Sequence, residues 1–136
     1  MENIDDFNRG VGLILGNLYQ TFPIPTILKI AELEAFEDVP DPTRKVRRLL
    51  VYSATMYFLQ EERFLRTTGA AGKKGHDMFA NVILTSKGLA ALSKTPGALA
   101  TGQNTAGDVL AELGRDMLKR GTWESFITVV RTILAG

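Results

Sequence analysis

Apolar residues near the amino terminus recur at steps of three and four, which is the spacing of one face of an α-helix. They are Phe7, Val11, Ile14, Leu15, Leu18 and Phe22. This pattern predicts a first helix over residues 5 to 20. Pro23 and Pro25 follow, and each proline favours extended backbone in the residue before it. We therefore expect a short edge strand or an extended link over residues 21 to 25.

Two more helices are expected before residue 63. Apolar residues at helical spacing predict a short second helix over residues 26 to 36, with Thr26 as its N-cap. Asp41 followed by Pro42 is typical of a helix start, so a third helix is predicted from 42 to about 62. The stripe of this third helix that we expect to be buried consists of Val46, Leu49, Leu50, Ser53, Ala54 and Tyr57.

The pattern changes after the third helix. Residues 64 to 68 and 78 to 84 are rich in β-branched and aromatic side chains, which predicts two strands. The glycine-rich, basic stretch 69 to 77 between them is predicted to form the tip of a long hairpin. Thr85 and Ser86 can then cap a short helix over residues 87 to 92.

The rest of the chain is predicted to be helical after a connector. Residues 97 to 105 are small and polar. Two amphipathic helices are predicted beyond them, on the apolar residues Val109, Leu110, Leu113 and Met117 and then Trp123, Phe126, Ile127, Val130, Ile133 and Leu134. We expect a mostly α protein with a small β-hairpin (α+β), divided into a domain over 1–95, a connector over 96–105 and a helical extension over 106–136 that together form one compact unit.

Composition limits the class of protein. A chain of 136 residues with 45% hydrophobic side chains suits one domain with a real core. It contains no cysteine, which excludes a disulfide framework and a thiolate metal site. The amino terminus lacks a basic leader region, and no apolar run approaches the roughly 18 residues needed to span a bilayer. We expect a cytoplasmic location.

The charges are distributed unevenly. Residues 42 to 76 contain eight basic residues and two acidic ones, whereas the first 41 residues contain eight acidic and two basic ones. A concentrated basic stretch is typical of a protein that binds phosphate groups. The charge pattern alone does not identify the partner.

The sequence gives little indication of a catalytic or cofactor site. The four serines have no local nucleophile motif, and His76 is the only histidine, so a histidine pair within one chain is excluded. Gly72-Lys73-Lys74-Gly75 lies between predicted strands and precedes no helix, unlike a phosphate-binding loop. We expect no enzyme activity, no metal and no cofactor.

Two stretches resemble a known family. The residues Phe58-Leu59-Gln60-Glu61-Glu62-Arg63-Phe64-Leu65-Arg66 are similar to the helix-to-strand passage of winged helix-turn-helix domains. Leu84-Thr85-Ser86-Lys87-Gly88-Leu89-Ala90-Ala91-Leu92 resembles the end of the second wing strand in MarR-like and PadR-like transcriptional regulators. The predicted order of elements over about residues 5 to 93 resembles that fold as well. This resemblance implies a recognition helix in the DNA major groove, a wing that touches the DNA backbone or minor groove, and a dimer made by terminal helices.

The resemblance also implies two sets of functional residues. The DNA-binding set is Thr26, Lys29, Arg44, Lys45, Arg47, Arg48, Lys73, Lys74 and His76. The dimerisation set is Leu113, Met117, Trp123, Phe126, Ile127 and Val130.

Two functions follow as expectations. The first is a bacterial-type transcriptional regulator that binds double-stranded DNA as a homodimer. The second is a winged-helix protein–protein interaction module, of adaptor or immunity type, that does not bind DNA.

Several acidic residues would repel phosphate unless the fold turns them away: Glu32, Glu34, Glu37, Asp38 and Asp41. Whether the last two helices dimerise or fold back on the first helix is open.

Overall fold

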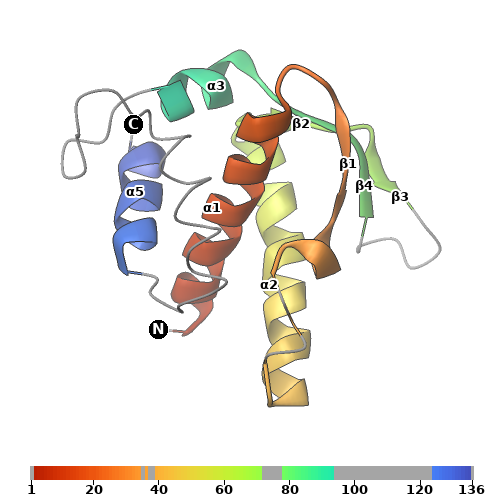
Figure 1. Ribbon diagram of the computed structural model, residues 1–136, viewed down its shortest axis with the longest axis vertical. Coiled ribbons are helices and arrows are strands. Elements are labelled where there is room, and N and C mark those ends of the chain that lie inside the picture. Colours follow the sequence, from red (N-terminus) through yellow and green to blue (C-terminus); the bar gives the residue numbers. More distant parts are fainter. Residues whose placement is uncertain (1, 35, 37–38, 72–77, 94–123, 136) are drawn as a thin grey trace.

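The computed structural model describes residues 2–34, 36, 39–71, 78–93 and 124–135 (Figure 1). This part of the chain has an α+β architecture. Its helices are α1 (Glu2–Thr21), α2 (Pro42–Glu61), α3 (Ser86–Ser93) and α5 (Glu124–Ala135), with a short 3-10 helix η1 (Ile30–Glu32). Its strands are β1 (Thr26–Lys29), β2 (Leu65–Arg66), β3 (Gly69–Ala71) and β4 (Met78–Leu84).

The strand β4 is the centre of the antiparallel sheet. It pairs with β1 on one side and with β2 and β3 on the other. The register of β1 shifts between Thr26 and Leu28, and Asn81 on β4 has a φ of 52°, a backbone conformation that asparagine tolerates better than most residues. This irregularity lets Phe79 and Val82, three positions apart, both face the core.

Several sequence predictions are confirmed. The first helix is α1, and the third is α2, where the Asp41 side chain accepts a hydrogen bond of 3.0 Å from the backbone N–H of Thr43 and Pro42 opens the helix. Strand 78–84 and the short helix after Thr85 are found as β4 and α3. Within the predicted strand over 64–68, residues 65–66 form the strand β2, whereas β3 lies at the beginning of the predicted loop. The rest of that loop, residues 72–77, lies outside the described residues.

The predicted helix over residues 26–36 is wrong. Residues 26–29 form strand β1, and only the three residues of η1 are helical there. The reason is that Leu28 and Ile30 are buried while Ile27 is 59% exposed, which is the alternation of a strand. Pairing with β4 therefore decides the conformation of this segment.

The helix α5 folds back onto the body of the protein. Figure 1 shows it beside α1, and its buried residues Val130 and Ile133 belong to the same hydrophobic core as Val11, Ile14 and Leu18 of α1. This arrangement answers the open question for the last helix, which packs against its own chain. The predicted connector and the helix on Val109, Leu110, Leu113 and Met117 lie outside the described residues.

Candidate interaction surface

The helix α2 carries apolar residues on two faces. Its inner face enters the core through Tyr52, Met56 and Leu59. On the opposite side, large apolar side chains recur every three or four residues and are open to solvent. We define the outer face of α2 as Thr43, Val46 (56% exposed), Arg47, Leu50 (65% exposed), Ala54, Tyr57 (39% exposed), Phe58 (40% exposed) and Glu61.

The outer face includes most of the stripe that the sequence predicted to be buried. That prediction is wrong within the single chain, because Val46, Leu50, Ala54 and Tyr57 are exposed and Leu49 and Ser53 are only half-buried. The helix α1 packs instead against the side that carries Tyr52. It approaches closely there because Gly10 has no side chain: a Cβ on Gly10 would lie 2.9 Å from Cδ1 of Tyr52.

A shallow groove extends the outer face toward α1. It has a volume of about 500 Å³ and is lined by Asn3, Phe7, Arg47, Leu50, Val51, Ala54, Thr55 and Phe58. The rings of Phe7 and Phe58 meet edge to face with centroids 5.0 Å apart. At the other end of the groove, Arg47 Nε donates a hydrogen bond of 3.0 Å to the side-chain oxygen of Asn3. The groove is therefore apolar in the middle and polar at one end.

A buried ionic cluster fixes how α2 sits against α1. Arg48 Nε lies 3.5 Å from the carboxylate of Asp6, and Arg48 Nη1 lies 3.2 Å from that of Glu34. Tyr52 donates a hydrogen bond of 2.5 Å to Glu34, and Arg9 lies 3.6 Å from Asp6. Burial, followed by the neighbouring charge of Glu34, raises the pKa of Tyr52 well above its ordinary value. With Arg48 and Tyr52 held inward, the outer face of α2 must point away from the core.

The predicted DNA-binding residues do not form one surface. Arg48 is only 7% exposed and is held by Asp6 and Glu34, so it cannot reach DNA as predicted. Arg44 and Arg47 are exposed near the start of α2, and Lys45 is half-buried.

The other predicted DNA-binding residues lie on strand β1 or outside the described residues. Thr26 and Lys29 are on a strand rather than on the expected helix, and Lys29 pairs with Glu32 at 3.7 Å. Lys73, Lys74 and His76 lie outside the described residues. Among the acidic residues expected to repel phosphate, Glu34 points inward and Asp41 caps α2.

The predicted dimerisation residues are also redistributed. Leu113, Met117 and Trp123, together with the side chains of Phe126 and Ile127, lie outside the described part of the chain. Val130 is fully buried in the core of its own chain, so its predicted place in a dimer interface is wrong.

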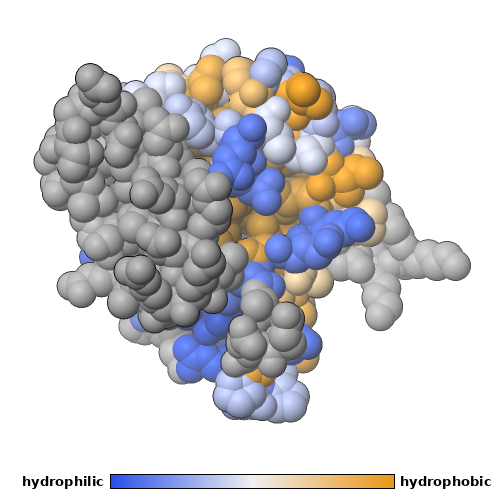
Figure 2. Space-filling view, in the orientation of Figure 1, coloured by the Kyte–Doolittle hydropathy of each residue, from blue (hydrophilic) through white to orange (hydrophobic). Residues whose placement is uncertain are grey.

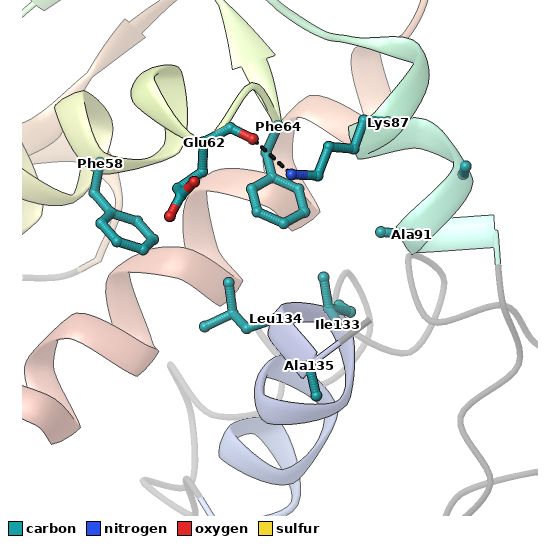
Figure 3. A pocket seen from close by; sticks show the side chains of 9 residues that line it. Phe58, Glu62, Phe64, Lys87, Ala91, Ile133, Leu134 and Ala135 are labelled. Atoms are coloured by element: carbon teal, nitrogen blue, oxygen red, sulfur yellow. Dashed lines mark hydrogen bonds between the residues drawn. The ribbon is translucent and has the colours of Figure 1, made fainter.

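A second hollow lies between the end of α2, α3 and α5 (Figure 3). It has a volume of about 440 Å³, and its walls are mainly apolar. Figure 3 shows Lys87 reaching across its upper edge, where Nζ donates a hydrogen bond of 2.8 Å to the backbone oxygen of Glu62 and lies 4.6 Å from the ring centre of Phe64. These contacts tie α3 to the end of α2, so the lysine has a structural use.

A pattern in the sequence could have indicated the outer face, because α2 has more apolar positions than one buried face needs. Val46, Leu50, Ala54 and Phe58 recur every fourth residue on a helix that has a second apolar face. In the view of Figure 2, blue and pale side chains surround smaller apolar patches at the lower end of the molecule, where α2 begins. Polar residues thus border apolar ones near this end of the helix.

Comparison of this chain with protein-family models, with curated proteins and with solved structures gives no match. Within the residues that the structure describes, no helix is both long enough and apolar enough to cross a membrane. We therefore infer the function from the surface itself.

Proposed function

We propose that this protein is a protein–protein interaction module that binds its partner through the outer face of α2 and the adjoining groove. The observation that carries this proposal is the run Val46, Leu50, Ala54 and Phe58, which is exposed along a single helix. Contiguous exposed apolar side chains rimmed by polar ones are typical of interaction sites. Anchors at helical spacing beside a groove are the usual means by which one helix recognises another.

The face is also rigid, which favours binding. The helix α2 has 20 residues and is capped by Asp41. The ion pair of Arg48 with Asp6 fixes its rotation against α1, and the hydrogen bond of Tyr52 to Glu34 fixes it against the segment after η1. A surface already held in its binding conformation loses less conformational entropy when a partner docks.

The chemistry of the face suits a protein better than DNA bases. A helix that reads the major groove uses side chains that hydrogen-bond to base edges. Val46, Leu50 and Ala54, in the middle of the outer face, have no side-chain donor or acceptor. Arg44 and Arg47 near its start could each contact a phosphate or a guanine, but the apolar middle of the face offers no group that reads a base.

The proposal can be tested by photo-crosslinking in the cells that produce the protein. The photoreactive residue p-benzoylphenylalanine replaces Leu50 in one variant and the exposed Asn17 of α1 in a matched control. We expect a protein crosslink from position 50 that is absent from position 17. No protein crosslink at position 50, or equal crosslinking at both positions, would contradict the proposal.

DNA binding by a winged helix is the second candidate. The sequence order α1, β1, α2, β2 to β4 and the central place of β4 favour it, with η1 standing where that fold has its second helix. In this case the protein would regulate transcription, and Arg44 and Arg47 would contact phosphates. The test is fluorescence anisotropy with labelled random-sequence duplex DNA over a range of salt concentrations.

The variant for this test is Arg44→Glu combined with Arg47→Glu, because both residues are exposed whereas the buried Arg48 would disturb the fold. Loss of about one unit of the salt slope per lost phosphate contact would support DNA binding. No binding by the wild type at low salt would exclude this candidate.

A further inference from the structure

The helix α2 is capped by the acidic Asp41, but the charged residues within it run against its own dipole. The amino-terminal end of a helix carries partial positive charge and the carboxyl-terminal end partial negative charge, so basic residues are unfavourable at the start and acidic residues at the end. Arg44, Lys45 and Arg47 lie in the first two turns, whereas Glu61 ends the helix and Glu62 follows it. The first turn has no acidic residue and the last turn has no basic one. A neighbouring helix of the same kind that runs in the opposite direction would stabilise it, because opposite charges would then lie side by side.

The positions of the outer face, rather than its residue types, are also symmetric about its middle. Each member before the midpoint between Leu50 and Ala54 has a counterpart at the same distance beyond it. The pairs are Leu50 with Ala54, Arg47 with Tyr57, Val46 with Phe58, and Thr43 with Glu61. A surface of this kind matches itself when it is turned around a two-fold axis through its centre.

We propose that the partner of the outer face is a second copy of this chain, bound with the two α2 helices antiparallel. This inference rests on the proposed function of that face. Leu50 would pack on the small Ala54 of the second copy, and Val46 on its Phe58. A shallow crossing of the two helices, one of the preferred packing geometries, keeps the helix ends close enough for charged residues to interact.

The charged rim supports the antiparallel direction. Arg47 would lie over the ring of Tyr57 in the second copy, a cation–π contact. Arg44, next to the Thr43 that is the counterpart of Glu61, would lie within side-chain reach of the Glu61 of the second copy, so both ends of the interface would pair opposite charges. In a parallel arrangement, basic residues would face basic residues and Glu61 would face Glu61. The polar rim is thus complementary in one direction only.

The dimer is expected to be reversible. A helix of 20 residues is about 30 Å long at 1.5 Å per residue. One face of such a helix is smaller than the roughly 800 Å² per partner of a standard stable interface. The groove beside Asn3 and Phe7 adds contact area. We therefore expect monomer and dimer to exchange as the protein is diluted.

The first test is sedimentation velocity on the purified full chain over about a hundredfold range of concentration. Wild type should shift from monomer to dimer across this range. Leu50→Glu should weaken association at least about tenfold, because it places a carboxylate in the apolar centre of the interface. The control Asn17→Glu changes an exposed position on α1 and should leave association unchanged.

The second test measures direction and register. Because the chain contains no cysteine, single cysteines report one contact each. Disulfide formation requires Cα atoms about 4.4 to 6.8 Å apart. A mixture of Leu50→Cys and Ala54→Cys should therefore form a mixed disulfide faster than Leu50→Cys alone, and Asn17→Cys should form none above background. Faster crosslinking of Leu50→Cys with itself would overturn the antiparallel arrangement.

Failure of the dimer can be told apart from failure of the interaction function. The chain could stay monomeric at every concentration while position 50 photo-crosslinks to a different protein. This result would contradict the dimer but support the interaction function. A monomeric chain with no protein crosslink at position 50 overturns both. A dimer that is unaffected by Leu50→Glu overturns the assignment of the interface to α2.

Discussion

Arg48 and Asp6 form a buried ion pair in which Arg48 Nε lies 3.5 Å from the carboxylate oxygen of Asp6. The two residues come from α2 and α1, so the pair joins the two long helices. Arg48 also reaches Glu34, which follows η1. One guanidinium thus holds three segments together, and it sets which face of α2 remains at the surface.

Replacing Arg48 should destabilise the protein strongly. In Arg48→Met, Glu34 keeps the hydroxyl of Tyr52 but loses its nearby cation, and Asp6 loses one of its two. Removal of one partner from a buried ion pair typically costs about 3 to 5 kcal/mol. The free energy of unfolding in urea, monitored by circular dichroism, measures this change.

The matched control is Arg47→Met, one residue earlier and exposed. The Arg47 side chain donates an exposed hydrogen bond to Asn3, and such a bond contributes about 0.5 to 1.5 kcal/mol, so this variant should lose much less stability than Arg48→Met. Equal losses in the two variants would show that the buried cluster does not stabilise the arrangement of α1 and α2.

Tyr52 should make the protein sensitive to alkaline pH. Burial and the neighbouring charge of Glu34 raise its pKa in the folded state. The unfolded chain releases the phenolic proton near pH 10, whereas the folded protein retains it. Stability contributed by this group is complete below that pH and falls as the pH rises beyond it, because the unfolded state then binds fewer protons.

The measurement is thermal unfolding at a series of pH values in wild type and Tyr52→Phe. The variant should lose about 1 to 3 kcal/mol near neutral pH, because Glu34 loses a buried hydrogen bond. Its stability should then decline less steeply above pH 10. Parallel declines in the two proteins would show that Tyr52 ionises equally in the folded and unfolded chains.

Gly88 should not tolerate a side chain. A Cβ at this position would lie 2.0 Å from the backbone oxygen of Phe64, so α3 or the segment between α2 and β2 would have to move. We expect Gly88→Ala to lower the free energy of unfolding by about 1 to 3 kcal/mol or more, as overpacking does. Ala90→Ser, on the exposed side of the same helix, should change it by less than about 0.5 kcal/mol. Denaturant unfolding of both variants measures these changes. Equal free energies of unfolding for Gly88→Ala and Ala90→Ser would show that the structure accommodates a side chain at position 88.

The sequence predicted the elements that depend on local chemistry. Asp41 and Pro42 define the start of α2 by capping and by a fixed φ angle, and these effects involve only neighbouring residues. The predicted helix over 26–36 failed because β1 is stabilised by β4, about 50 positions along the chain. Apolar residues in that segment fit both periods, and only the distant partner distinguishes them.

The candidate site could be predicted only in part, for the same reason. The spacing of Val46, Leu50 and Ala54 correctly identified one face of a helix, but not which surface covers it. The burial of Arg48 depends on Asp6, which is 42 positions earlier in the sequence, and on Glu34. The basic run over residues 44–48 therefore contains the buried Arg48, the half-buried Lys45 and the exposed Arg44 and Arg47, and sequence proximity could not separate them.

Exchanging the charges at the two ends of α2 should reveal the proposed antiparallel dimer. Arg44→Glu would set two acidic residues against each other at each end of the interface, and Glu61→Lys two basic ones, so each variant should associate several-fold more weakly than wild type. The double variant Arg44→Glu/Glu61→Lys restores opposite charges across the antiparallel pair, and it also places an acid at the start of the helix and a base at its end, as the dipole prefers. Sedimentation equilibrium should show that the double variant dimerises again. At high salt, where exposed charges are screened, the dissociation constants of the variants should become similar. If the double variant associated as weakly as the weaker single variant, positions 44 and 61 would not meet across the interface.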